Sequence, residues 1–316
     1  QNLGGDRGPP RVSLRQHLLN RCLRLTEKPL LARANPQMLR ATMEMQARLF
    51  FKGPRDVFAE WRGLPGAGSV LWLTPQGPSN GRVILYVHGG GFVFGSPETH
   101  RAMVARLALL TGAQAVLPRY ARVPEAAFPK PAEDIRAAWD ALCRTGIAAR
   151  DIVIGGDSAG GALVFDLLAE LCREGAALPA GVFGLSPLLD MTFSGASFTQ
   201  NAESDVLLPA ARAAEMARLY LRGQSAESPR ASPILADFKG APPVWLTVSD
   251  SEILRDDSRR FAARLRDAQV PVTFQEVHDL PHVWPLFQNH LPEARETLAT
   301  LAEWISALPP DRAGES

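Results

Sequence analysis

The chain has 316 residues, of which 46% are hydrophobic and 21% charged, and its 34 basic and 33 acidic residues give a net charge of +1. This composition is that of a globular protein, and it excludes disordered, collagen-like and coiled-coil chains. Because the basic excess that phosphate binding requires is missing, nucleic acid is not expected as a partner.

Cysteine usage and apolar runs indicate the compartment. Cys22, Cys143 and Cys172 are widely spaced without a Cys-x-x-Cys pair, so we expect reduced core thiols and neither a disulfide framework nor a zinc site. No apolar run approaches the roughly 20 residues of a membrane-spanning helix, and the polar start lacks the apolar stretch of a signal peptide. These features predict a cytoplasmic protein with no membrane partner.

Taken in chain order, the sequence starts with two helix-like stretches, residues 12–25 and 36–50, that have no strand of their own to pack on. After a Gly- and Pro-rich break at residues 63–68, short β-rich runs alternate with helical ones. The predicted strands are residues 69–74, 82–87, 114–117, 151–154, 181–185, 243–249 and 271–277. The predicted helices are residues 98–110, 131–143, 159–174, 208–221, 254–268 and 292–308. This alternation predicts an α/β fold with a mostly parallel central sheet flanked by helices.

One interval breaks the alternation. Residues 186–242 contain a long loop and one strong helix, which is typical of a lid rather than of a simple crossover between strands. Residues 309–316 are expected to form a frayed tail.

A candidate nucleophile lies in Gly156-Asp157-Ser158-Ala159-Gly160, directly after a predicted strand and at the start of a predicted helix. This is the G-x-S-x-G pattern in the strand, turn and helix setting of a nucleophile elbow. Small residues are needed because the turn is tight, and the turn leaves the serine hydroxyl exposed at the helix N-terminus. The context favours Ser158 as a nucleophile over a plain glycine-rich loop.

A second glycine motif, His88-Gly89-Gly90-Gly91, also follows a predicted strand. Three glycines let the backbone approach a ligand and direct N–H groups at a developing oxyanion. The lysine of a phosphate-binding loop and the spacing of a dinucleotide fingerprint are both missing. We expect His88 to fasten this loop by hydrogen bonds rather than to act in catalysis.

A nucleophilic serine needs a general base. His282 is the first candidate because it follows the last predicted strand and lies between Pro281 and Pro285, and His278 is the reserve. The other histidines are His17, His88, His100 and His290. His17, His100 and His290 fall on helical or terminal stretches, where surface or capping roles are expected.

These motifs together resemble the hormone-sensitive-lipase-like esterases, the α/β-hydrolase branch marked by His-Gly-Gly-Gly and Gly-Asp-Ser-Ala-Gly. The resemblance covers about residues 40–308, and residues 120–125 are similar to the family's Tyr-Arg-Leu-Ala-Pro-Glu segment. It implies an α/β-hydrolase fold in which residues 51–316 form the catalytic domain. It also implies a helical cap built from residues 1–50 and an insertion at about residues 190–223.

The family's acid motif, Asp-Pro-Leu-x-Asp, is matched by Glu-Ile-Leu-Arg-Asp at residues 252–256. In α/β-hydrolases the acid follows the nucleophile and precedes the histidine. Glu252, at the first acidic position, is the expected triad acid, and Asp256, at the second, is the alternative. Asp250 and Asp257 are expected to bind backbone N–H groups.

The resemblance implies a carboxylesterase that acts on short-chain acyl esters through an acyl-enzyme, with no metal and no organic cofactor. Backbone N–H groups of Gly89, Gly90 or Gly91 and Ala159 would hold the oxyanion. A non-catalytic small-molecule receptor of the same fold and an amidase or deacetylase of the same family remain as alternatives. The main partner would be a small-molecule ester, and residues 271–277 offer an edge through which a homodimer could pair.

Overall fold

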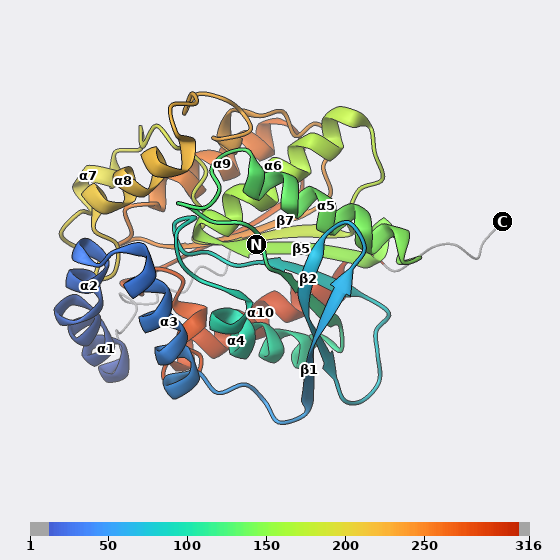
Figure 1. Ribbon diagram of the computed structural model, residues 1–316, viewed down its shortest axis with the longest axis horizontal. Helices are drawn as coiled ribbons and strands as arrows, with labels where there is room; N and C mark the ends of the chain where they lie inside the picture. The colour runs from blue at the N-terminus through green and yellow to red at the C-terminus, as the bar shows by residue number, and fades with distance from the viewer. Residues whose placement is uncertain (1–12, 310–316) are drawn as a thin grey trace, which may run out of the picture.

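The computed structural model describes residues 13–309, and its centre is an eight-stranded sheet between two layers of helices (Figure 1). The strand order is β1-β2-β4-β3-β5-β6-β7-β8, in which β1 pairs with β2, and β2 with β4, in antiparallel fashion. All other neighbours are parallel, which confirms the expected α/β fold with a mostly parallel sheet. The strands are β1 (Val57–Leu64), β2 (Gly68–Pro75), β3 (Val83–Val87), β4 (Gln114–Pro118), β5 (Ile152–Asp157), β6 (Gly181–Leu185), β7 (Val244–Ser249) and β8 (Val272–Val277).

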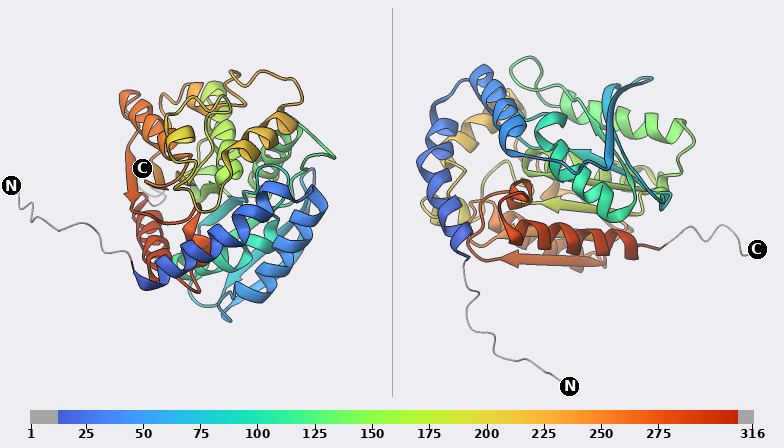
Figure 2. Two further views of the ribbon diagram at one scale, coloured as in Figure 1. Left: turned by 90° about the vertical axis from the view of Figure 1, so that its left-hand side faces the viewer. Right: turned by 90° about the horizontal axis from the view of Figure 1, so that it is seen from below.

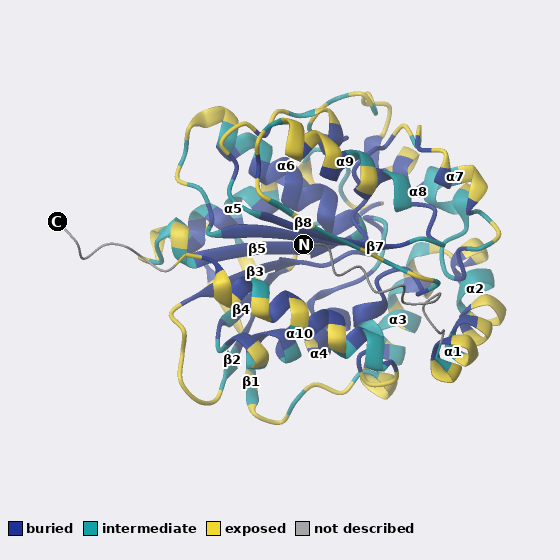
Figure 3. Ribbon diagram, turned by 180° about the vertical axis from the view of Figure 1, so that it is seen from behind, coloured by how far each residue is buried: buried dark blue, intermediate teal, exposed yellow. Residues whose placement is uncertain are grey.

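Helices cover both faces of this sheet, so the inner strands are buried on both sides (Figures 1 and 3). One face carries α4 (Pro97–Thr111) and α10 (Pro292–Ala307), and the other α5 (Lys130–Arg144), α6 (Ser158–Glu174) and α9 (Arg255–Asp267). Side chains of β3 alternate between the two cores, with Ile84 in one and Leu85 in the other. Double coverage explains why these strands are unbroken apolar runs.

The remaining helices gather at one end of the sheet, as the views in Figures 1 and 2 show. They come from the two segments that the sequence assigns to a cap. The first provides α1 (Leu14–Leu25), α2 (Glu27–Arg33) and α3 (Pro36–Phe50), and the second α7 (Ser197–Gln200) and α8 (Ala210–Leu221). Residues 1–12 of the expected cap and residues 310–316 of the expected tail lie outside the described residues.

The structure contains two elements that the sequence analysis did not expect, β1 and α2. The glycine-rich break at residues 63–68 is the turn of the hairpin that joins β1 to β2. One expectation is wrong. Cys22 is exposed, and Cys143 and Cys172 are only half-buried, so the free cysteines are not core thiols.

The described part of the chain contains no helix that is both long and apolar enough to cross a bilayer. Short 3-10 turns complete the fold: η1 (Ala149–Asp151), η2 (Pro233–Leu235) and η3 (Trp284–Phe287). β8, the strand expected to pair in a homodimer, forms one edge of the sheet.

Candidate active site

Ser158 lies on the sharp turn between β5 and α6, with a positive φ of 50°. Its glycine neighbours are required by close packing, because a Cβ on Gly160 would lie 2.2 Å from the Val87 carbonyl oxygen. A Cβ on Gly156 would lie 2.8 Å from the same oxygen. The chain thus holds a serine in strained backbone geometry at the carboxyl end of a central parallel strand, as the elbow pattern predicts.

His282 and Glu252 form a buried pair after β8 and β7, with Nδ1 of the imidazole 2.5 Å from Oε2 of the carboxylate. The other carboxylate oxygen accepts hydrogen bonds from the Ser186 hydroxyl at 2.7 Å and from the Ser249 N–H at 2.8 Å. Both Glu252 oxygens are therefore held in place. A carboxylate fixed in this way orients the imidazole and stabilises its protonated form.

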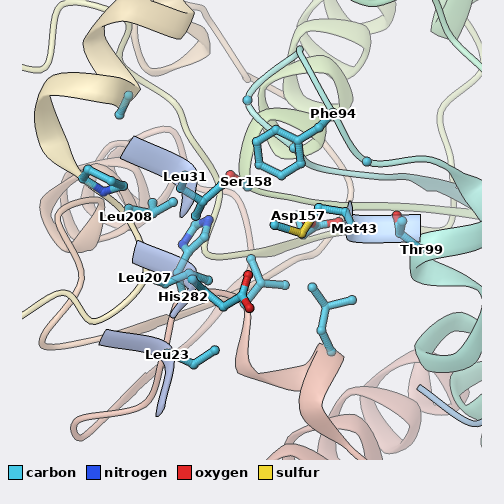
Figure 4. A pocket seen from close by; sticks show the side chains of 18 of the residues that line it. Leu23, Leu31, Met43, Phe94, Thr99, Asp157, Ser158, Leu207, Leu208 and His282 are labelled. Carbon is cyan, nitrogen blue, oxygen red and sulfur yellow. The ribbon is translucent and has the colours of Figure 1, made fainter. Parts of the chain in front are cut away.

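The second ring nitrogen of His282 is directed at the pocket. Its Nε2 is buried and has no hydrogen-bond partner among residues 13–309. Ser158 and His282 line the same pocket, and Figure 4 shows the imidazole turned towards the serine. Burial lowers the pKa of His282, but the charge of Glu252 and its hydrogen bond outweigh this effect, so the net shift is upward.

The competing carboxylates are engaged elsewhere. Asp250 binds His278, with Oδ2 2.6 Å from Nδ1, so this carboxylate and the reserve histidine pair with each other at the surface. Asp256 accepts hydrogen bonds from the Ser197 N–H at 2.9 Å and from Arg255 Nε at 3.0 Å. The structure thus brings only Glu252 to His282.

Asp157, next to the nucleophile, ties the two glycine motifs together. Its Oδ1 accepts hydrogen bonds from the Tyr86 hydroxyl at 2.8 Å and from the Gly89 N–H at 3.0 Å. Its Oδ2 lies 3.2 Å from His100 Nε2. Burial raises the pKa of Asp157, but the neighbouring histidine and these hydrogen bonds bring the net shift below the ordinary value.

This arrangement bears on the expected oxyanion donors. The Gly89 N–H is occupied by Asp157 and is not available to a ligand. The N–H groups of Gly90, Gly91 and Ala159, in contrast, make no hydrogen bond within the described residues. Gly90 and Gly91 also have positive φ values of 115° and 58°, which only glycine adopts without strain.

His88 fastens the glycine loop, as the sequence predicts. Its ring stacks on Tyr120 at a centroid distance of 4.3 Å, and its Nδ1 lies 2.8 Å from the Gly89 carbonyl oxygen. The Tyr120 hydroxyl donates to the His88 carbonyl oxygen at 2.7 Å. Burial and the nearby His100 lower the pKa of His88 to about 3, so its ring is neutral.

His100 is the site residue that sequence reasoning missed, since it is buried against Asp157 and is no surface histidine. The sequence around His100 nevertheless has a pattern that indicates a buried position. Met103, Val104 and Leu107 follow it at the third, fourth and seventh positions, which places all four residues on one face of α4. Because these three side chains are buried, that face is the one packed on the sheet.

The pocket has a volume of about 380 Å³ and is lined mainly by apolar side chains (Figure 4). Leu31 and Met43 come from the first cap segment, Leu208 from the second, and Phe94 from the loop after the glycine motif. A few polar side chains interrupt this wall, among them Glu27, whose Oε1 accepts a hydrogen bond from Gln46 at 2.8 Å. Such a pocket suits a small, largely apolar ligand. Within residues 13–309, no three His, Cys, Asp or Glu side chains gather as metal ligands would.

Comparison with known proteins agrees with this geometry. A family model described as alpha/beta hydrolase fold matches residues 84–286. The chain is 37% identical to an acetyl-hydrolase of Streptomyces hygroscopicus over 76% of this chain and 80% of that protein. It is 32% identical to an esterase of Acinetobacter venetianus over 86% of this chain and 89% of that protein. The crystal structure of an esterase from the bacterial hormone-sensitive lipase family superposes with a TM-score of 0.88 at 34% identity, covering 94% of this chain and 98% of the other.

The chain therefore belongs to the α/β-hydrolase fold family. The resemblance to the hormone-sensitive-lipase-like esterases is confirmed, as is the expected enzyme class, a carboxylesterase.

Proposed function

We propose that this enzyme hydrolyses short-chain carboxylic esters with Ser158, His282 and Glu252 as its catalytic triad. The observation that supports this most directly is the buried histidine pair, in which Nδ1 contacts Glu252 and Nε2 is left without a partner at the pocket. With Nδ1–H donating to the carboxylate, Nε2 is the nitrogen that accepts a proton.

In the proposed reaction, Nε2 of His282 takes the proton of the Ser158 hydroxyl while Oγ attacks the ester carbonyl. The bond between the carbonyl carbon and the alcohol oxygen breaks, and His282 gives the proton to that oxygen. The acyl group stays bound to Ser158 as an acyl-enzyme. Water, activated by the same imidazole, then releases the carboxylic acid. The free N–H groups of Gly90, Gly91 and Ala159 stabilise the negative oxygen in both steps, and loss of one such donor costs roughly 100- to 1,000-fold in rate.

The cap and the pocket support a preference for short acyl groups. Two helical segments close an apolar space of about 380 Å³ around Ser158, and a space of this size holds a small ligand. We expect catalytic efficiency on p-nitrophenyl esters to fall beyond an acyl length of about eight carbons. Greater activity on emulsified long-chain triglyceride than on soluble butyrate would contradict this preference.

The decisive test is Ser158→Ala. We expect this variant to keep its circular dichroism spectrum and to lose hydrolysis of p-nitrophenyl butyrate, because no other covalent nucleophile is proposed. A serine-directed organophosphate should label wild type at Ser158 and leave the variant unlabelled. Turnover at about a tenth of the wild-type rate would exclude the mechanism, since loss of a triad nucleophile costs several orders of magnitude.

The alternatives differ in their products. A receptor of this fold would bind esters without releasing acid, and an amidase or deacetylase would cleave matched aryl amides or acetylated amines faster than esters. A panel of acetyl, butyryl and longer aryl esters beside their amide counterparts, with a binding assay on the same compounds, separates these functions. The name acetyl-hydrolase in one relative makes the acetyl compounds the first members of that panel.

A further inference from the structure

The first cap helix, α1, buries two amide side chains and exposes three leucines. Gln16 and Asn20 are buried, whereas Leu14, Leu18 and Leu25 are 75%, 58% and 68% exposed. The spacing of these leucines, four and seven residues apart, places them on one stripe of the helix. A helix that packs on a globular protein normally buries such a stripe and exposes its amides.

The buried amides have partners that explain their position. Gln16 Nε2 donates to the carbonyl oxygens of His278 at 3.1 Å and Asp279 at 2.6 Å, and Asn20 Nδ2 donates to the latter at 2.7 Å. The inner face of α1 is therefore fixed by hydrogen bonds. The leucine stripe faces away from the rest of the described residues.

Positive charges flank the leucine stripe. α1 carries Arg15, Arg21 and Arg24 and no acidic residue. All three arginines are exposed, and within residues 13–309 neither Arg15 nor Arg21 forms an ion pair or a hydrogen bond through its side chain. Leucines bordered by arginines on one outward helix face are the pattern of helices that lie in a lipid interface.

A second helix of the first cap segment, α3, also has an exposed apolar stripe. Met38, Met45 and Leu49 of α3 are exposed at spacings of seven and four residues, which places them on one side of the helix. Figure 2 (left) shows the helices of the first cap segment together on one face of the molecule. Residues 14–50 contain seven basic and two acidic residues, a net charge of +5, whereas the whole chain has +1 and the remainder therefore −4.

We propose that the outer face of α1 and α3 docks the enzyme on an anionic lipid surface. Burial of the exposed leucines and methionines in the acyl region would supply the apolar attraction, and the arginines would meet the anionic headgroups. Charge disfavours a second copy of the chain as the occupant, because two faces that both present the exposed arginines of α1 would repel each other. The proposal departs from the expectation of no membrane partner, which rested on the absence of a spanning helix and of a signal peptide.

Docking would also bring the pocket close to lipid. Leu19 and Leu23 of the same helix line the pocket, so the docking face and the pocket wall are two sides of α1. An apolar ester dissolved in the acyl region would have a short path to Ser158.

The test is binding of the full chain to vesicles, measured by co-sedimentation. We expect binding to phosphatidylcholine vesicles that contain about one third phosphatidylglycerol, weak binding to phosphatidylcholine alone, and loss of affinity when salt rises from about 0.05 to about 0.5 M. Leu14→Gln combined with Leu18→Gln, and separately Arg15→Gln combined with Arg21→Gln, should each weaken binding by about tenfold or more.

The matched control is Leu110→Gln combined with Leu235→Gln, two exposed leucines outside this surface, which should bind as wild type does. The Leu14 and Leu18 variant should hydrolyse soluble p-nitrophenyl butyrate at the wild-type rate, because neither residue lines the pocket. Absence of vesicle binding, equal binding to uncharged vesicles, or an equal loss in the control would overturn the proposal. A homodimer in the absence of lipid that the Leu14 and Leu18 changes dissociate would assign the surface to a second copy instead.

Discussion

His278 and Asp250 form an exposed counterpart of the buried histidine–carboxylate pair, with Nδ1 and Oδ2 2.6 Å apart against 2.5 Å between His282 and Glu252. Both pairs join the segment after β7 to the segment after β8. They differ in surroundings, because only the buried pair includes a residue that lines the pocket. Surroundings, rather than the presence of a histidine and a carboxylate, therefore select the proposed catalytic pair.

The first prediction ranks the three candidate acids. Glu252→Gln should lower kcat by up to roughly 10,000-fold, because an amide neither stabilises the imidazolium nor fixes the tautomer of His282. Asp250→Asn and Asp256→Asn should lower kcat by less than about tenfold, because their carboxylates contact partly exposed groups. The test is to measure kcat of the three variants under identical conditions and to check the fold of each by circular dichroism. A larger loss in either Asn variant would move the acid to that position.

The second prediction concerns pH. The base must be neutral to accept the proton of Ser158, and the charge and hydrogen bond of Glu252 hold the pKa of His282 above its ordinary value despite burial. Activity should therefore rise with pH along a limb that lies above the usual histidine range. In Glu252→Gln, burial acts without the compensating charge, so the limb of the residual kcat/KM should move to lower pH. An unchanged limb would mean that another group controls the acidic side.

The third prediction tests the packing of the elbow. An Ala side chain at position 160 would meet the backbone carbonyl oxygens of Val87 at 2.2 Å and His88 at 2.6 Å. Gly160→Ala should therefore reduce the free energy of unfolding by roughly 3 kcal/mol or more. Gly63→Ala, in β1 where nothing lies within 4 Å of the added Cβ, is the matched control and should change it by less than about 1 kcal/mol. Urea unfolding of both variants gives the comparison, and similar midpoints would show that the elbow tolerates a methyl group.

The fourth prediction concerns Asp257, which is buried behind the second cap segment. Burial raises its pKa to about 7, although the Leu189 and Asp190 N–H groups donate to its Oδ2. Because the unfolded value is about 3.9, the folded state binds the extra proton. The stability that this proton contributes is complete below about pH 4 and is lost as pH rises through 7.

Asp257→Asn keeps an acceptor for the two N–H groups and cannot ionise. The variant should therefore lose less unfolding free energy than wild type between about pH 5 and pH 8, as measured by urea unfolding at each pH. The control is Asp237→Asn at an exposed position, which should leave the pH dependence of the unfolding free energy unchanged. An equal pH dependence in wild type and Asp257→Asn would contradict the assignment.

The sequence predicts the inner strands because each is an apolar run that helices cover on both faces, and it fails at β1 for the opposite reason. β1 is an edge strand with exposed Phe58 and half-exposed, mixed positions, so no alternation or apolar run marks it. Its turn glycines indicate only a break in the pattern, because a hairpin turn and a linker use the same residues. The short helix α2 begins at Glu27 without a side-chain cap, and Pro29 in its first turn gives a conflicting signal.

In the site, motifs predict which residues meet but not which atoms remain free. Ser158, Glu252 and His282 each follow a parallel strand, and parallel strands end at one edge of the sheet, so their approach could be expected. The hydrogen bond from the Gly89 N–H to Asp157 could not be expected in the same way. Asp157 lies 68 residues away in the sequence and becomes a neighbour only through the pairing of β3 with β5.

The amides of Gln16 and Asn20 link two segments that lie far apart in the sequence. They bind the carbonyl oxygens of residues 278 and 279, about 260 positions along the chain and a few residues before His282. A cap exchanged for one of different shape would also remove supports of the segment that carries the proposed base. The first cap segment, which lines the pocket, and the segment that carries His282 therefore depend on each other. A chimera that receives a foreign first cap segment should need the matching residues 278–283 as well.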